Sequence, residues 1–246
     1  MATVLITRPV SQAAELQQLF QQRGLDTICY PVISIQPPEQ WLETDSAIGQ
    51  LSHFDWLIFA SVNGVQFFLR RCQQRTGSIE LVRECRIAAI GQRTTRELET
   101  FGLKVDLIPT QSDSQGLALA LTQRASQETL LLIRGDRGSR VLAQELAAAS
   151  INFREIVVYR SVDLPVADPL LVEQLRRGEI DWVTVTSSAI ARGLVRLFGD
   201  ALKNTRLASI SPTTTRQLLE LGFPPTVEAT QFDMQGIVTA IDSHPC

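Results

Sequence analysis

A stretch of 36 residues occurs twice in this chain, and this repetition limits the folds that the sequence can adopt. Residues 86–121 align with residues 206–241 without a gap, at a constant offset of 120 (206 − 86), and 14 of the 36 aligned positions are identical. A repeat of this length is typical of a supersecondary unit that occurs twice in one fold. Each copy predicts a strand, a helix, a second strand and a second helix.

The first helix of each copy has the sequence of a capping box. Thr94 is followed three residues later by Glu97, and Thr214 is followed by Gln217. In such a box the hydroxyl accepts a hydrogen bond from a free backbone N–H group at the helix start. Free N–H groups at a helix start also attract anions. The pattern therefore predicts helix caps at Thr94 and Thr214, and it leaves open whether an anion binds beside them.

A shorter strand–helix–strand unit is also repeated, at residues 3–30 and 130–159. The chain order is then short, long, short, long, and the helices between strands predict parallel sheets of an α/β protein. A tandem arrangement would place the link between two domains at 122–129. An interleaved arrangement needs two crossings, and prolines occur at both places where it needs them, residues 32–38 and 161–169. The prolines favour interleaving.

The interleaved prediction divides the chain as follows. Domain 1 comprises residues 1–33 and 168–246, domain 2 comprises residues 39–160, and residues 34–38 and 161–167 are linkers. In this arrangement strand 4–7 belongs to the same sheet as strand 183–186. Two connectors side by side would let the domains hinge around a cleft, which is a usual place for a ligand.

Composition excludes several classes of function. The four cysteines show no CxxC spacing and there are only two histidines, so neither a metal site nor a histidine-based catalytic triad is expected. The net charge of −3 argues against nucleic acid as a partner. No apolar run approaches the ~20 residues of a membrane span, and no secretory signal is recognisable. We expect a cytoplasmic monomer, or a protein of an organelle stroma if a transit segment was removed.

Polar residues follow the apolar strands, where open parallel sheets bind ligands. Arg8 follows the first strand, Arg134 and Gly135 follow a later one, and Tyr159 ends a strand before a linker. Hydroxyls and amides follow two further strands, at Ser61, Asn63, Gly64, Thr186, Ser187 and Ser188. No serine has a plausible general base nearby in the sequence, so these groups are predicted to be hydrogen-bond donors to a ligand. Ordinary strand-to-helix turns with solvated charges are the alternative.

The chain resembles the uroporphyrinogen-III synthase family in the order and spacing of five short motifs. These are Phe59-Ala-Ser-Val-Asn-Gly-Val65, Ala89-Ile-Gly-Gln-Arg-Thr94, Val157-Val-Tyr-Arg160, Val185-Thr-Ser-Ser188 and Ile210-Ser-Pro-Thr-Thr214. The resemblance implies two flavodoxin-like, three-layer αβα domains of interleaved connectivity, joined by a two-stranded linker. The chain departs from the family pattern at Ser211, where members of the family commonly have a glycine.

The resemblance also implies a reaction. The family closes hydroxymethylbilane, a linear tetrapyrrole with eight carboxylates, with inversion of its last ring and loss of water, and without a cofactor. The tyrosine of the Val-Tyr motif, Tyr159, is then expected in the active site, and the last motif adds Pro212, Thr213 and Thr214 to the residues expected to bind substrate. A non-catalytic, hinged binding module for a small polyanion is the alternative.

Overall fold

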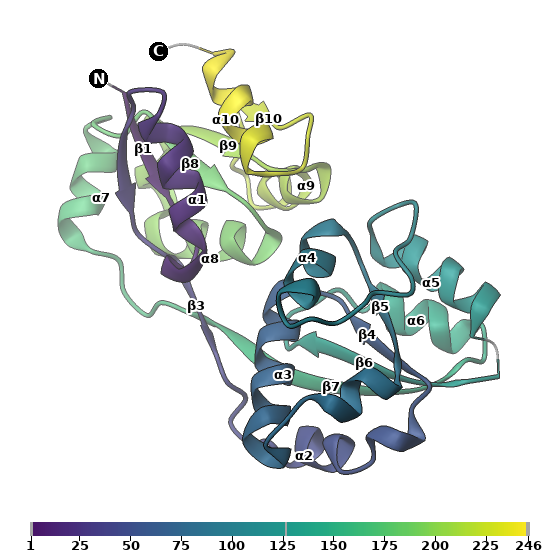
Figure 1. The fold of residues 1–246 in the computed structure, drawn as a ribbon. Helices are drawn as coiled ribbons and strands as arrows, with labels where there is room; N and C mark the ends of the chain where they lie inside the picture. Colours follow the sequence, from purple (N-terminus) through teal and green to yellow (C-terminus); the bar gives the residue numbers. More distant parts are fainter. Residues whose placement is uncertain (1, 126, 245–246) are drawn as a thin grey trace. The chain divides into compact units, whose positions relative to one another are not determined.

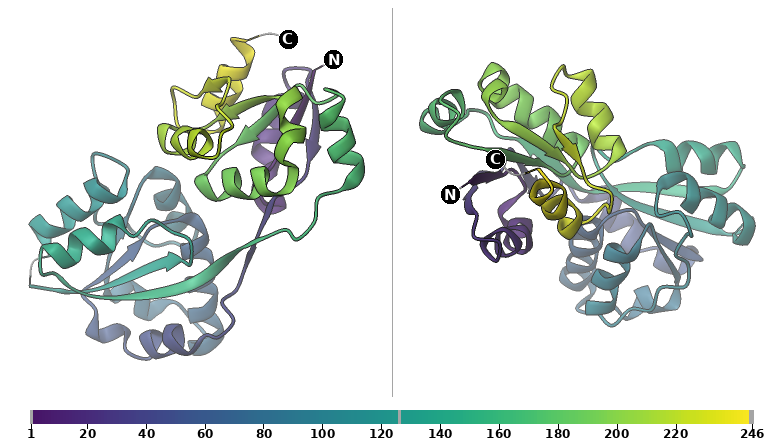
Figure 2. Two further views of the ribbon diagram at one scale, coloured as in Figure 1. Left: turned by 180° about the vertical axis from the view of Figure 1, so that it is seen from behind. Right: turned by 90° about the horizontal axis from the view of Figure 1, so that it is seen from above.

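The computed structural model describes residues 2–125 and 127–244, and it contains two five-stranded sheets with helices on both faces of each (Figures 1 and 2). The chain divides into two compact units, residues 1–35 together with 161–246 (unit 1) and residues 36–160 (unit 2). The pairings among β1, β2, β8, β9 and β10, and those among β4, β5, β6 and β7, are parallel, as the predicted α/β class requires.

Unit 1 contains one sheet with the strand order β10-β9-β8-β1-β2. Its elements are β1 (Thr3–Ile6), α1 (Val10–Gln21), β2 (Asp26–Cys29), α7 (Pro169–Arg176), β8 (Trp182–Val185), α8 (Ser188–Phe198), β9 (Arg206–Ser209), α9 (Pro212–Glu220), β10 (Val227–Glu228) and α10 (Met234–Asp242). A 3-10 helix, η3 (Gly199–Asn204), precedes β9.

The pairing of β1 with β8 brings together segments from opposite ends of the chain. Val4 pairs with Trp182 and Ile6 with Thr184, while the other edge of β1 pairs with β2. The prediction that the first strand shares a sheet with the strand near residue 183 is therefore confirmed.

Unit 2 contains the second sheet, with the order β3-β7-β6-β4-β5. Its elements are α2 (Leu42–Ile48), η1 (Leu51–His53), β4 (Trp56–Phe59), α3 (Val62–Thr76), η2 (Glu80–Glu84), β5 (Arg86–Ala89), α4 (Gln92–Thr100), α5 (Ser114–Arg124), β6 (Thr129–Gly135) and α6 (Val141–Ala148). The strands β3 (Ile33–Gln36) and β7 (Asn152–Asp163) belong to the same sheet and cross the boundaries between the units.

The two sheets have the same strand order once the chain is permuted. The central strands β9-β8-β1-β2 of unit 1 correspond to β5-β4-β6-β7 of unit 2, so both sequence repeats contribute to both sheets. The second strand predicted for each long repeat is present as β10 in one copy. In the other copy it is reduced to a single bridge between Ala88 and Leu107, so that part of the prediction is wrong.

Each sheet has an apolar layer on both faces, because alternate strand residues point in opposite directions. Val4 and Ile6 pack with α1 and α10, whereas Leu5 packs with α7, α8 and α9. In unit 2, α3 and α4 cover the face of Leu57 and Phe59, and α5 and α6 cover the other. Each unit therefore has three layers, helix, sheet and helix, and the predicted fold class is confirmed.

Two neighbouring strands, β3 and the end of β7, connect the units. The Leu164 N–H donates to the Val32 carbonyl at 3.2 Å, and the Ser34 hydroxyl donates to the Val162 carbonyl at 3.5 Å. The proline-bearing stretches of the sequence therefore form a hydrogen-bonded, two-stranded linker.

Candidate functional site

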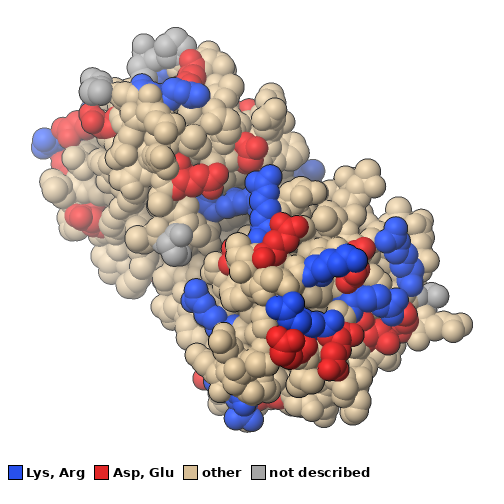
Figure 3. All heavy atoms as spheres, in the orientation of Figure 1, with Lys and Arg blue, Asp and Glu red and all other residues tan. Residues whose placement is uncertain are grey.

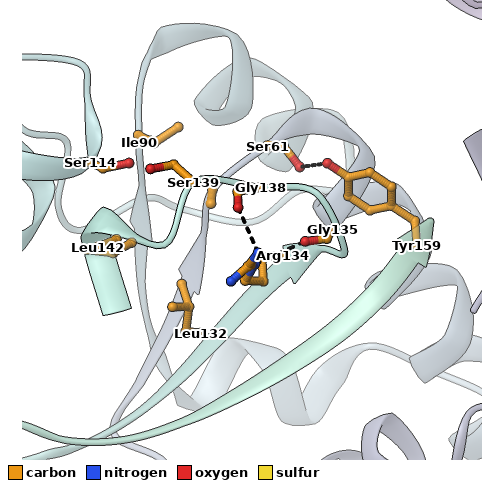
Figure 4. A pocket seen from close by; sticks show the side chains of 11 residues that line it. Ser61, Ile90, Ser114, Leu132, Arg134, Gly135, Gly138, Ser139, Leu142 and Tyr159 are labelled. Atoms are coloured by element: carbon orange, nitrogen blue, oxygen red, sulfur yellow. Dashed lines mark hydrogen bonds between the residues drawn. The ribbon is translucent and has the colours of Figure 1, made fainter. Parts of the chain in front are cut away.

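In unit 2 a small cavity lies at the carboxyl ends of the strands, where parallel sheets hold ligands (Figure 4). Its volume is about 120 Å³. The polar lining includes Ser61 after β4, Ser139 after β6 and Tyr159 on β7. The remaining lining residues are Ala60, Ile90, Ser114, Leu132, Arg134, Gly135, Gly138 and Leu142.

Ser61 has two roles in this site. Its hydroxyl oxygen caps α3 by accepting a hydrogen bond from the Gly64 N–H at 3.0 Å, and it lies 3.1 Å from the Tyr159 hydroxyl. The helix begins directly after Ser61, at Val62, so this serine is held at the helix start.

Tyr159 is a half-buried phenol whose hydroxyl points toward Ser61 (Figure 4). Its ring stacks on Phe67, with 5.9 Å between centroids and 29° between planes. Burial raises the pKa of Tyr159, and Asp136 raises it further, while hydrogen bonds from Ser61 and Asn63 and the charge of Arg134 lower it. The balance is a raised pKa, so at neutral pH the phenol is protonated and can donate a proton.

Arg134 is buried, and its guanidinium holds the turn that follows β6. It donates to the carbonyl oxygens of Gly135 at 3.0 Å, Asp136 at 3.3 Å and Gly138 at 2.7 Å, and it forms an ion pair with Glu155 at 3.1 Å. These contacts differ from the solvated turn that we considered as an alternative. Direct binding of a substrate acid by Arg134 stays a prediction, and the structure adds a role in holding the backbone.

Both predicted capping boxes are wrong. Helices α4 and α9 begin at Gln92 and Pro212, and the N-cap residues are Gly91 and Ser211, neither of which caps with its side chain. Thr94 and Thr214 lie inside the first turn and are buried. The reason is that the extended N-cap residue follows the strand almost at once, so each helix starts before the threonine is reached.

The sequence repeat contains two true side-chain caps that we missed. Asp113 accepts a hydrogen bond from the Gly116 N–H at 2.8 Å, and Asp233 accepts one from the Gly236 N–H at 2.7 Å. The signal was available, because the aspartate and the glycine three residues later are identical in both copies.

The corresponding strand ends of unit 1 hold the other predicted residues. Ser187 caps α8 by accepting from the Ile190 N–H at 3.2 Å, and its neighbours Thr186 and Ser188 are half-buried. The buried guanidinium of Arg8 donates to Gln12 and to the sulfur of Met234. Pro212 and Thr213 are exposed at the start of α9.

The two units differ at the position of the tyrosine. Tyr30, which precedes the linker as Tyr159 does, accepts a hydrogen bond from the Asp168 N–H at 3.0 Å and donates to the Val166 carbonyl at 3.3 Å. The Tyr159 hydroxyl therefore contacts a serine side chain, whereas the Tyr30 hydroxyl contacts backbone groups. This difference between the repeats indicates that Tyr159 has a role beyond packing.

The polar groups at the strand ends described above are proton donors and hydrogen-bond donors. Burial raises the pKa of the Cys72 thiol to about 12 and that of Cys85 to about 11, so neither is a thiolate nucleophile at neutral pH. Within residues 2–125 and 127–244, no three His, Cys, Asp or Glu side chains are grouped to hold a metal ion. No helix of this part of the chain is long and apolar enough to cross a membrane.

On the face shown in Figure 3 the surface charges do not form a field of one sign. Acidic and basic side chains are interspersed on the face shown in Figure 3, consistent with the net charge of −3. An anionic ligand would then have to be held by local amides, hydroxyls and guanidinium groups.

Comparison with known proteins gives a consistent result. A sequence model of the uroporphyrinogen-III synthase (HemD) family matches residues 14–239. The uroporphyrinogen-III synthase of Synechococcus elongatus is 30% identical over 98% of this chain and 94% of its own. That of Chlorobaculum parvum is 28% identical over 98% of both chains. The crystal structure of the uroporphyrinogen-III synthetase from Helicobacter pylori superposes with a TM-score of 0.71 at 17% identity, covering 100% of both chains, so its likeness concerns the fold.

Proposed function

Because this chain belongs to the uroporphyrinogen-III synthase family, we propose that it closes hydroxymethylbilane to uroporphyrinogen III, a step of tetrapyrrole biosynthesis. The reaction is a lyase reaction, in which the last ring is inverted and water is lost. The observation that carries the proposal is the match to the family model over residues 14–239. The alternative of a non-catalytic binding module is not favoured by this membership.

In the proposed mechanism Tyr159 acts as the general acid. The phenol donates its proton to the hydroxyl group on the first ring of the substrate, the C–O bond breaks, and water leaves. The pyrrole nitrogen supplies the electron pair, so an electrophilic, protonated azafulvene forms beside the tyrosine phenolate. Protonation of a leaving group by a positioned side chain is a usual contribution to catalysis. The raised pKa leaves the phenol in its protonated form at neutral pH, which the role requires, although it also makes the phenol a weaker acid than an ordinary tyrosine.

The proposed substrate-binding residues lie at the strand ends and helix starts of each unit, where N–H groups, hydroxyls and guanidinium groups contact carboxylates of the substrate. In unit 2 they are Ser61, Asn63, Gly64, Thr94, Arg134 and Gly135, and in unit 1 they are Arg8, Thr186, Ser187, Ser188, Pro212, Thr213 and Thr214. Pro212 has no N–H and is proposed as a contact residue only. Backbone amides at helix starts and neutral hydroxyls are suited to carboxylates.

We propose that the protein acts as a cytoplasmic or stromal monomer, without a cofactor and without nucleic acid as a partner. Light scattering of the purified protein tests the monomeric state, and the expected molecular mass is that of one chain, 27.3 kDa.

The activity test is incubation of the purified protein with hydroxymethylbilane, followed by oxidation and separation of the type I and type III uroporphyrins. The type III isomer is the expected product. Formation of the type I isomer alone, as in a reaction without enzyme, would contradict the proposed function.

Ser187→Ala is expected to weaken substrate binding by about fivefold to tenfold, because loss of one neutral donor costs on the order of 1 kcal/mol. The change should appear mainly in KM. Since Ser187 also caps α8, urea unfolding must show that the variant is folded under assay conditions. Ser243→Ala, an exposed serine at the end of α10, is the matched control and should leave KM unchanged. A complete loss of turnover in folded Ser187→Ala would assign this serine a chemical role that we do not propose.

A further inference from the structure

Gly135 at the end of β6 lies in contact with the ring of Tyr159 (Figure 4). A Cβ atom added to Gly135 would lie 2.3 Å from Cζ of the tyrosine, 2.5 Å from Cε2 and 2.8 Å from the hydroxyl oxygen. The described glycines with a positive φ do not include Gly135, so the backbone conformation does not require glycine at this position. The absence of a side chain at Gly135 is therefore explained by the tyrosine ring.

An irregularity in the sheet brings the two residues together. Arg134 pairs with Val157, but the next residue, Gly135, pairs with Tyr159, so β7 gains one residue relative to β6 at this point. The Asp136 N–H then donates to the Tyr159 carbonyl at 3.1 Å. Such a bulge redirects a side chain. Here it accompanies the placement of the phenol opposite the glycine.

The turn after Gly135 is held in place by Arg134. Its guanidinium donates to three carbonyl oxygens between Gly135 and Gly138, and it is buried. A buried group with several charge-assisted hydrogen bonds to the backbone leaves little freedom to the turn. Arg134 therefore fixes the backbone against which the Tyr159 ring lies, and this fixing does not depend on the ring.

We propose that Gly135 is a positioning residue, which seats the Tyr159 ring across the end of β6 so that the phenol hydroxyl meets Ser61 and faces the substrate. This inference rests on the proposed function, in which Tyr159 is the proton donor. In this role Gly135 acts through the tyrosine, in addition to the contact with a substrate carboxylate proposed above. Arg134 serves the same placement by fixing the turn.

The titration of Tyr159 tests the placement independently of activity. The chain has two tyrosines, so Tyr30→Phe leaves Tyr159 as the only phenol, and ultraviolet difference absorbance then follows its ionisation alone. In this background Gly135→Ala is expected to shift the titration midpoint of Tyr159, because the ring must leave its hydrogen bond to Ser61. Gly138→Ala is the matched control in the same turn. Its added Cβ would lie 3.4 Å or more from its neighbours and should leave the midpoint unchanged.

Turnover gives the second measurement. Gly135→Ala is expected to lower kcat by a factor similar to that of Tyr159→Phe, with a smaller change in KM, because binding groups elsewhere are unaltered. An unchanged titration midpoint, or a shifted midpoint with an unchanged kcat, overturns the proposal. Failure of the wild-type protein to form the type III isomer would instead contradict the proposed function, and it is recognised before any variant is made.

A double variant keeps the test decisive if Gly135→Ala does not fold. In Gly135→Ala/Tyr159→Ala the ring is absent and the added methyl group has room. We therefore expect the double variant to have the urea midpoint of Tyr159→Ala alone. If the methyl group lowers the urea midpoint as much without the ring as with it, Gly135 is required for a reason unrelated to Tyr159, and the proposal is wrong.

Discussion

Tyr159→Phe is expected to lower kcat about 100-fold, the lower end of the 10²–10⁴ range for loss of a general acid. The lower end is expected because the pyrrole nitrogen drives departure of the hydroxyl and water can substitute as the proton donor. KM should change little, since the phenyl ring keeps its contact with Phe67. The measurement is steady-state turnover of hydroxymethylbilane, with substrate affinity determined separately.

The matched control is Tyr30→Phe, which removes the chain's other phenol. The Tyr30 hydroxyl is bonded to Val166 and Asp168, and the variant should keep the wild-type kcat. If Tyr159→Phe retains the wild-type kcat, Tyr159 has no part in proton donation, and the site would then only bind and fold the substrate.

The pH dependence provides a related expectation. A general acid is active while it holds its proton, and the pKa of Tyr159 is raised above that of an ordinary phenol, ~10. Activity limited by this group should therefore persist through neutral pH and decline only above the ordinary phenol range. The decline should be absent from the residual activity of Tyr159→Phe. An alkaline decline centred below the ordinary phenol pKa would contradict the assignment.

The largest loss of stability is expected from Gly236→Ala. The added Cβ would lie 2.0 Å from the Gln231 carbonyl oxygen, and since this is a backbone atom the turn before α10 must move. Overpacking of this kind costs typically 1–3 kcal/mol, and we expect about 3 kcal/mol here because a backbone atom must shift. Gly116→Ala should behave alike, since its Cβ would lie 2.2 Å from the Gln111 carbonyl oxygen.

Urea unfolding followed by circular dichroism measures this loss. Gly49→Ala at the end of α2 is the control, because its Cβ would lie 3.5 Å from the nearest recorded atom, an ordinary contact. A loss for Gly236→Ala within about 0.5 kcal/mol of the control, the usual range for neutral surface changes, would show that the turn relaxes freely.

The fold could be predicted from sequence because its signals are local or repeated. Apolar strands such as 56–59 and 182–185 carry their own pattern, and the repeat predicts similar units from both copies. The second strand of the long repeat is the exception, since it is a strand in one copy and a single bridge in the other. The prolines at the two predicted crossings favoured the interleaved connectivity over the tandem one. The helix starts at Gln92 and Pro212 were mispredicted because a Thr-x-x-Glu pattern occurs inside a first turn as easily as before it.

The candidate site was predictable in position but not in its contacts. The end of β4 is recognisable in the sequence, so Ser61 could be placed at one edge of a parallel sheet. The strand end predicted at Tyr159 is wrong, because β7 continues to Asp163. The hydrogen bond between Ser61 and Tyr159 accompanies a bulge in β7, and this bulge leaves no local pattern in the sequence. The orientation of Arg134 depends on carbonyl groups of the following turn, and a basic residue before glycines is equally compatible with a ligand contact.

The pairing of β1 with β8 has a consequence for how the chain is made. Val4 and Ile6 pair with Trp182 and Thr184, so this pairing cannot form until ribosomal synthesis has passed residue 184. Residues 36–160, by contrast, are contiguous and complete 24 residues earlier (184 − 160), and domains generally fold as they emerge. The first strands of the chain must therefore wait with one edge of β1 unpaired while the middle of the chain folds.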